Sequence, residues 1–260
     1  MYFVVCIKQV PETTDVKIDP VTNTLMREGV ASIINPFDKF AIEEAIRQRD
    51  KHGGKVTVIT MGPLQAKEAL KEALAMGADE AVLLSDRAFA GADTLATSYT
   101  LARAIRKLGK ADLVLCGKQA IDGDTAQVGA GIAQQLGIPQ LTYVRKVTIE
   151  GSILTVERAL QDCYEVVRCK LPALVTCVKE LNEPRLPTLR GIMMASQKEI
   201  TVWGARDIAA NPARIGLNGS PTRVVTVFTP TRRGKGGILS GDVDEAVDKL
   251  VEKLLEAQAI

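Results

Sequence analysis

The stretch DLVLCGKQAIDGDTAQVG, residues 112–129, contains a strand signal, a turn and a helix start in succession. Its apolar run at 113–116 is typical of a strand covered on both faces, and a glycine ends that run. The turn is rich in small and polar residues, and residues 126–136 predict a helix that Asp124 or Thr125 would cap. Such a turn directs free backbone N–H groups at one point, as phosphate sites do. We expect a nucleotide site here, and a capped turn without a ligand is the alternative.

The chain before residue 136 alternates predicted strands and helices. The strands are expected at 3–7, 55–61, 81–84 and 113–116, and the helices at 39–51, 65–76, 94–108 and 126–136. Because parallel neighbours need helical crossovers, this order predicts a doubly wound, mainly parallel α/β sheet. Ligands bind at the carboxyl ends of the strands in such sheets. The residues that follow these ends should share one crevice, and they are Lys8, Gln9, Met61, Gly62, Ser85, Asp86 and 117–125.

After residue 136 the pattern changes to alternating apolar and polar residues. Antiparallel strands are expected at 140–149, 153–159 and 164–169, followed by a buried strand at 173–178. The core should close there. We therefore expect a nucleotide-binding α/β domain over residues 1–200, and a linker with a C-terminal helix over residues 201–260.

Two later segments suggest contacts with other proteins. Residues 181–199 contain two prolines and several apolar side chains without a regular period, and long irregular loops of this kind are usually functional. Asp242 would cap an amphipathic helix at 243–257. This helical arm would either pack on its own core or reach over a partner subunit.

Composition narrows the classes of function. The 260 residues carry a formal net charge of +2, which gives a nucleic-acid-binding role no electrostatic support. No apolar run approaches the roughly 20 residues of a membrane span, and the first ten residues resemble a core strand rather than a signal peptide. We expect a cytoplasmic protein. The five cysteines form no CxxC motif and are expected to be buried thiols rather than disulfides or metal ligands.

The sequence offers no catalytic constellation. The single histidine, His52, precedes two glycines at a predicted helix end, where a capping role is expected. GAGIAQ at 129–134 begins like GxGxxG, but it lies inside a predicted helix, and the chain has no GxxxxGK[ST]. We expect no catalytic residue and no metal site. The chain should hold a nucleotide, and the chemistry should belong to a cofactor.

Six motifs, in order along nearly the whole chain, resemble the beta subunit of electron transfer flavoprotein. They are KQVPE at 8–12, NPFD at 35–38, ALAMGAD at 73–79, the stretch at 112–129, KLPALVT at 170–176 and LNEPRLPTLRGIM at 181–193. The resemblance implies a Rossmann-like fold of the adenine nucleotide alpha hydrolase-like type. It also implies a heterodimer with an alpha subunit that holds the main flavin, and electron transfer between dehydrogenases and an acceptor.

The resemblance also implies which residues bind the nucleotide. Cys6 and Met61 would line the adenine or ribose, Phe37 would approach the alpha-subunit flavin, and residues of the turn, above all Asp122, Asp124, Thr125 and Gln127, would surround the phosphates. The expected cofactor-binding residues are Cys6, Asn35, Pro36, Phe37, Asp38, Met61, Asp93, Thr94, Thr97, Gly117, Lys118, Gln119, Asp122, Gly123, Asp124, Thr125, Ala126, Gln127 and Val128.

Leu189 would recognise the partner. In the resembling family, a leucine of the corresponding loop docks into a pocket on the partner dehydrogenase, and an exposed apolar anchor in a proline-bounded loop suits that task. The expected partners are the alpha subunit, an acyl-CoA dehydrogenase-like or quinone-linked protein, and ferredoxin or flavodoxin.

The stretch FAGADTLAT, residues 89–97, bears on which nucleotide binds. The beta subunits of the resembling family carry either a structural AMP or a second FAD. Asp93 would cap the helix, while Thr94 and Thr97 lie one turn apart and would hydrogen-bond a longer dinucleotide. Alternatively, these threonines face solvent without a ligand. VPETTDVKIDP and GADTLATS resemble the bifurcating branch found in anaerobes, and so we expect FAD.

With FAD, the resemblance implies that electrons from NADH are split between two acceptors. One goes to ferredoxin or flavodoxin, and the other passes through the alpha-subunit FAD to a high-potential acceptor. With AMP, the chain would be a non-bifurcating beta subunit. Two further alternatives are a stand-alone adenine-nucleotide sensor and an ATP-using ligase or pyrophosphatase, although KQVPE stands where the ligase fold carries its glycine-rich ATP loop.

Overall fold

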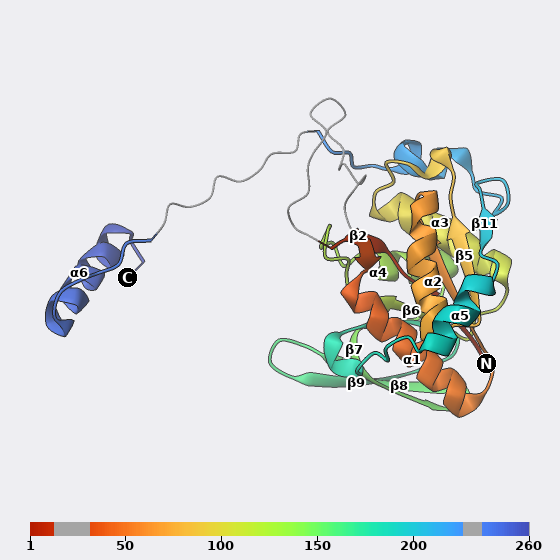
Figure 1. Ribbon diagram of the computed structural model, residues 1–260, viewed down its shortest axis with the longest axis horizontal. Helices are drawn as coiled ribbons and strands as arrows, with labels where there is room; N and C mark the ends of the chain where they lie inside the picture. Colours follow the sequence, from red (N-terminus) through yellow and green to blue (C-terminus); the bar gives the residue numbers. More distant parts are fainter. Residues whose placement is uncertain (13–31, 226–235, 260) are drawn as a thin grey trace. The chain divides into compact units, whose positions relative to one another are not determined.

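A nine-stranded sheet forms the centre of the first of two compact units (Figure 1). The computed structural model describes residues 1–12, 32–225 and 236–259. Along the sheet, the strands are β11 (Thr201–Trp203), β5 (Glu80–Leu84), β4 (Lys55–Met61), β1 (Tyr2–Cys6), β6 (Leu113–Gly117), β10 (Ala173–Cys177), β7 (Gln140–Glu150), β8 (Ile153–Ala159) and β9 (Tyr164–Lys170).

The pairing of these strands confirms a doubly wound, mainly parallel sheet with antiparallel additions. Every neighbouring pair from β11 to β7 is parallel, whereas β8 and β9 are antiparallel to their neighbours. A separate pair, β2 (Gln9–Pro11) and β3 (Ser32–Ile34), is antiparallel. From the sequence, residues 16–18 and 24–26 could pair as a small hairpin, but this segment lies outside the described residues.

Helices cover both faces of the sheet. In β1, Phe3 and Val5 pack into one hydrophobic cluster, and Val4 and Cys6 pack into the other, because successive side chains of a strand point to opposite faces. The first cluster is covered by α1 (Pro36–His52) and α2 (Lys67–Met76), with α5 (Leu189–Gln197) packed on α2. The second is covered by α3 (Thr94–Leu108) and α4 (Val128–Leu136).

Three local expectations were wrong. Helix α4 begins at Val128, two residues later than expected, because Asp124 and Ala126 both have a φ of 53° and extend the turn. Neither Asp124 nor Thr125 caps it; the N-cap position is Gln127, whose side chain makes no cap bond. Residues 181–199, expected to be irregular, contain α5.

Helix α5 segregates its apolar side chains, contrary to the expected lack of a regular period, but these side chains do not face the core. Among its residues only Ala195 is buried, while Ile192, Met193 and Met194 are exposed. A hydrogen bond from Gly191 N to Thr188 Oγ1 (3.0 Å) caps its start. The helix is therefore defined by its cap and its contact with α2 rather than by a buried stripe.

The first compact unit extends to Val225, so the expected boundary after residue 200 lies inside it. Residues after 200 belong to this unit because β11 pairs with β5, and because Ile208 and Ile215 are buried in the second cluster. The second unit, Thr226–Ile260, contains α6 (Val243–Glu256). As expected, Asp242 caps this helix, because its Oδ1 accepts a hydrogen bond from Glu245 N (2.9 Å). Among the described residues, no helix combines the length and the apolar character that a membrane span requires.

Candidate nucleotide-binding site

The order of the strands reverses between β1 and β6, and the expected crevice would lie between the carboxyl ends of these two strands. From β1 the chain proceeds to β4 and β5 on one side, and then crosses through α3 to β6 on the other. Such a reversal is the point where doubly wound sheets bind ligands. The two strands are in register, with Cys6 opposite Cys116. Across this point Lys8 Nζ forms an ion pair with Asp122 Oδ1 (2.6 Å).

Asp38 joins the ends of the two strands. Its side chain is buried at the start of α1. Asp38 Oδ2 accepts a hydrogen bond from Lys8 N (2.7 Å), and Oδ1 accepts bonds from Gly117 N (3.1 Å) and Asn35 Nδ2 (3.0 Å). One carboxylate therefore fixes the positions at which the chain leaves β1 and β6.

Asn35 fixes the first half of the turn that follows β6. It stands at the N-cap position of α1, but its side chain does not cap that helix, and exposed Pro36 follows at the first helical position. Instead, Asn35 Nδ2 donates to the carbonyl oxygen of Gln119 (2.8 Å), and Oδ1 accepts from Ile121 N (3.1 Å). The buried amide thus ties α1 to a loop more than 80 positions later in the chain.

Glycines allow the elements around the turn to approach closely. A Cβ at Gly117 would lie 2.3 Å from Asp38 Oδ1 and 2.7 Å from the carbonyl carbon of Phe37. A Cβ at Gly131 would lie 2.7 Å from Ser98 Oγ, so α3 and α4 are in close contact near their starts. The crevice therefore lies beside two adjacent helix starts.

The second half of the turn carries backbone N–H donors that lack acceptors. Asp124 N donates to the carbonyl oxygen of Ala120 (2.8 Å), and Gln119 Nε2 donates to the Asp124 carboxylate. Within the part of the chain that the structure describes, no acceptor is present for the N–H groups of Asp122, Gly123, Thr125, Ala126, Gln127 and Val128. Left-handed conformations at Asp124 and Ala126 cost about 1–2 kcal/mol each and are concentrated at ligand sites.

Helix α3 begins with the expected cap. Asp93 Oδ1 accepts hydrogen bonds from Leu95 N (2.9 Å) and Ala96 N (3.0 Å), and Oδ2 accepts from Thr222 N (3.1 Å) and Thr222 Oγ1 (2.9 Å). Although burial raises the pKa of Asp93, these bonds hold it below its usual value. The hydroxyls of Thr94 and Thr97 have no partner among the described residues, and so they are available to a ligand.

The remaining expected residues surround the same edge of the sheet. Cys6 is buried, and half-buried Met61 packs against the same cluster, as does Val128. A hydrogen bond with Cys6, and then burial, raises the pKa of the Cys116 thiol well above its usual value, so that thiol is neutral. Cys6, Cys116 and Cys177 are buried free thiols, as expected from the sequence, but the free thiol of Cys163 is exposed and that of Cys169 is half-buried.

Aromatic rings flank a lysine at this edge. Lys118 Nζ lies 5.8 Å from the Phe37 ring centroid and 5.5 Å from that of Tyr143, within cation–π range. Tyr143 was missed by the sequence interpretation: it has a φ of 57° and donates its N–H to Thr176 Oγ1 (3.0 Å). No local signal marks it. Leu189, by contrast, is not part of this site, since it opens α5 and is 77% exposed.

Asp38 should make stability depend on pH. Burial raises its pKa from 3.8 to about 7, against the hydrogen bonds from Asn35, Lys8 N and Gly117 N. Because the folded state binds this proton more tightly than the unfolded state, the contribution is present at low pH and is lost as pH rises to about 7. We expect the free energy of unfolding to fall between pH 4 and pH 8, by at most about 4 kcal/mol from this group.

Urea unfolding at several pH values checks this prediction. In Asp38→Asn, the decrease of the free energy of unfolding with pH should become smaller. Asp162 is exposed, so Asp162→Asn serves as the matched control and should show the same pH dependence as wild type. If the free energy of unfolding changed equally with pH in Asp38→Asn and in wild type, Asp38 would be ionised over the whole range from pH 4 to pH 8.

The chain is similar to known proteins over most of its length. The electron transfer flavoprotein domain model matches residues 22–208. The chain is 60% identical over 255 residues to the electron transfer flavoprotein subunit beta of Thermoanaerobacterium thermosaccharolyticum, covering 98% of both chains. It is 54% identical over 262 residues to the caffeyl-CoA reductase-Etf complex subunit CarD of Acetobacterium woodii, covering both chains fully. It is 46% identical over 267 residues to protein FixA of Azorhizobium caulinodans, covering 99% of this chain and 95% of that protein.

The family model spans more than half of the chain, and these relatives match it almost from end to end. The chain therefore belongs to the electron transfer flavoprotein family, as a beta subunit that functions in electron transfer.

Proposed function

We propose that this beta subunit binds FAD at the switch point between β1 and β6 and takes part in electron bifurcation with its alpha subunit. The complex would accept electrons from NADH, deliver one to ferredoxin or flavodoxin, and deliver the other through the alpha-subunit FAD to a high-potential acceptor. A bound flavin supplies the step from two-electron to one-electron transfer. The protein supplies the binding site, its electrostatics and the partner contacts.

The observation that carries this proposal is the run of N–H groups without acceptors in the turn before α4. The turn at 122–127 and the first turn of α4 offer free donors on both sides of Asp124 and the positive end of a helix dipole, as a phosphate group requires. Asn35 and Asp38 hold the turn to α1 and β1, so these donors are ordered before a ligand arrives. The site thus fits a diphosphate without a metal ligand set.

The start of α3 supports a dinucleotide over AMP. Thr94 and Thr97 present two hydroxyls that have no partner within the described ranges, beside the start of α4, where Gly131 allows the close helix contact. Asp93 is already occupied by four hydrogen bonds, so its role would be to position Thr94 rather than to bind the ligand. A molecule longer than AMP would reach both helix starts.

Lys118 would influence the redox potential of a flavin bound at the edge of this site. Its ammonium group lies between the rings of Phe37 and Tyr143, which fixes a positive charge beside the crevice. Such a charge favours the anionic form of a nearby redox group and raises its potential. We assign Phe37 and Lys118 to the side of the site that faces the alpha-subunit flavin.

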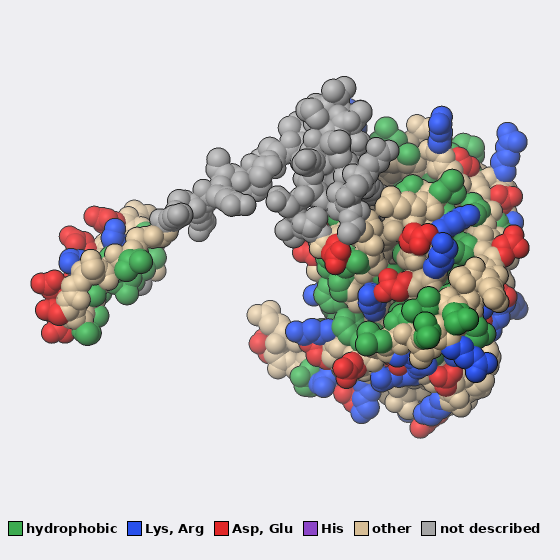
Figure 2. Space-filling view, in the orientation of Figure 1, with side chains coloured by type: hydrophobic (Ala, Val, Ile, Leu, Met, Phe, Trp, Pro, Cys, Tyr) green, Lys and Arg blue, Asp and Glu red, His purple; other side chains and the backbone are tan. Residues whose placement is uncertain are grey.

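An acyl-CoA dehydrogenase-like protein is the proposed high-potential partner. The name of the similar CarD subunit places that protein in a complex with a caffeyl-CoA reductase. On this chain, Leu189 and its neighbours on α5 form an exposed apolar surface, and hydrophobic side chains gather over α5 in Figure 2. Exposed apolar clusters of this kind mark interaction sites. Leu189 would be the anchor residue that inserts into a pocket on the partner.

The test is NADH oxidation by the purified heterodimer with its acceptors supplied separately and together. We expect ferredoxin to be reduced only when an acyl-CoA dehydrogenase and its enoyl-CoA substrate are also present, because both electrons of each pair must leave. Ferredoxin reduction without the second acceptor, or no oxidation of NADH under any condition, would rule out bifurcation.

A further inference from the structure

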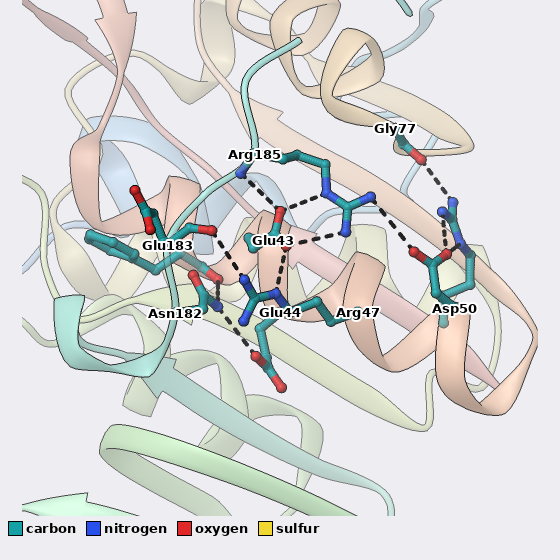
Figure 3. Close-up of polar contacts among 10 residues, drawn as sticks. Glu43, Glu44, Arg47, Asp50, Gly77, Asn182, Glu183 and Arg185 are labelled. Atoms are coloured by element: carbon teal, nitrogen blue, oxygen red, sulfur yellow. Dashed lines mark hydrogen bonds and ion pairs between the residues drawn. The ribbon is translucent and has the colours of Figure 1, made fainter. Parts of the chain in front are cut away.

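The segment 182–188, which leads from the η3 turn (Lys179–Leu181) to α5, lies along α1 and is held there by polar contacts (Figure 3). Asn182 Nδ2 donates to the carbonyl oxygen of Phe40 (3.0 Å). In the other direction, Arg47 Nη2 donates to the carbonyl oxygen of Glu183 (3.2 Å). None of the side chains of the segment is buried, so apolar packing does not hold it.

Glu43 is the centre of these contacts. Its Oε2 accepts hydrogen bonds from Arg185 N (3.1 Å) and Arg185 Nε (2.8 Å), and its Oε1 accepts from Arg185 Nη2 (3.2 Å) and Arg47 Nε (2.6 Å). Only 2% of Glu43 is exposed. Burial raises its pKa, but the bonds from Arg185 and Arg47 hold that pKa below its usual value. We call Glu43, Arg47 and Arg185 the α1 clamp.

The α1 clamp fixes one end of an apolar surface, and a lysine fixes the other. After α5, Lys198 Nζ donates to the carbonyl oxygens of Ala78 (3.0 Å) and Asp79 (2.9 Å) at the end of α2. Between these anchors α5 touches the backbone of α2, since a Cβ at Gly191 would lie 2.4 Å from the carbonyl oxygen of Ala75. The exposed apolar side chains of this surface are Leu186, Leu189, Ile192, Met193 and Met194.

The charge beside this surface favours a partner with an acidic rim. Arg190 follows Leu189, is exposed, and forms no ion pair with any described residue. Arg185 is occupied by Glu43 and Asp50, so Arg190 is the cation that is available next to the anchor. An apolar pocket bordered by carboxylates on a partner dehydrogenase would complement both features.

We propose that Glu43 and Arg185 are positioning residues for docking of the partner dehydrogenase, which rests on the proposed function. By holding segment 182–188 on α1, they keep Leu186 and Leu189 in place before the partner arrives. Without the clamp, the segment would become ordered only when the partner binds. The loss of its conformational entropy would then make the free energy of binding less favourable. None of the three clamp residues is among the candidate nucleotide-binding residues, and the clamp acts through the apolar surface alone.

Arg185→Ala in the complete heterodimer tests this proposal. Glu43 keeps Arg47 as a partner in this variant, so α1 should remain folded. With a purified acyl-CoA dehydrogenase as the acceptor, we expect its KM to rise about tenfold and kcat to stay within about twofold. Arg185→Lys, which keeps the charge, should recover most of the affinity. The matched control is Arg103→Ala, which removes an arginine that ties Ile208 to α3, and it should leave KM unchanged.

Hydrogen exchange supplies a readout that does not need the partner. Amides of residues 182–195 should exchange about tenfold faster in Arg185→Ala than in wild type. An unchanged KM, a loss confined to kcat, or unchanged exchange would overturn the positioning role. A wild-type heterodimer that does not reduce the dehydrogenase would instead overturn the proposed function, and the exchange rates would still decide whether Arg185 orders the segment.

Discussion

Gly117→Ala should leave the beta subunit without its nucleotide and destabilise the fold by about 3 kcal/mol. The added methyl group would lie 2.3 Å from Asp38 Oδ1 and 2.8 Å from Asp38 N, where buried backbone leaves little freedom to move. The clash would also break the hydrogen bond from Gly117 N to Asp38. Overpacking of this severity lies at the upper end of small-to-large substitutions.

Cofactor content after purification, together with urea unfolding of the same preparation, measures both effects. Gly236→Ala is a control outside the site, because a Cβ at Gly236 meets no atom within 4 Å. This control should retain both cofactor and stability. Normal cofactor content in Gly117→Ala would show that the junction of β6 and α1 does not shape the site.

Asn35→Ala should weaken nucleotide binding more than tenfold and cost about 3 kcal/mol of stability. The substitution removes three hydrogen bonds at once, and it leaves Ile121 N and the carbonyl oxygen of Gln119 without their partner. A polar group that loses its partner costs about 1–3 kcal/mol when it is buried, and these two hydrogen bonds are partly buried. Because the turn would no longer be held to α1, its N–H donors would need to be ordered by the ligand.

Titration of the nucleotide-free heterodimer with FAD, by fluorescence quenching, gives the affinity of this variant. Asn211→Ala is its control, since Asn211 caps a single turn at an exposed position and should change neither affinity nor stability by more than about 1 kcal/mol. Wild-type affinity in Asn35→Ala would mean that the turn keeps its shape without α1.

The sequence predicts the central sheet well because its strands are apolar runs of characteristic length. β1, β4 and β6 are covered on both faces, and the helices between them require parallel pairing. The edge strand β11 was not expected, because three residues give no periodic signal. Helix α5 was not expected either, since its apolar residues face outward.

The site is predicted only where its chemistry is local. The turn can be recognised in the sequence because it is rich in glycine and aspartate. The left-handed conformations at Asp124 and Ala126, which delay the start of α4, cannot be predicted in this way because neither residue is a glycine. The bonds from Asn35 to the turn join residues 84 and 86 positions apart, and those from Arg185 to Glu43 join residues 142 apart. The spacing of residues along the chain cannot predict contacts over such distances in sequence.

The number and kind of nucleotides in the purified heterodimer test the central claim most directly. The cofactors are released by denaturation, separated, and counted against protein. Because the N–H donors before α4 and the hydroxyls of Thr94 and Thr97 suit a dinucleotide, we expect two FAD and no AMP for each heterodimer. One FAD and one AMP would contradict a second flavin in this subunit, and one FAD with no other nucleotide would contradict the site itself.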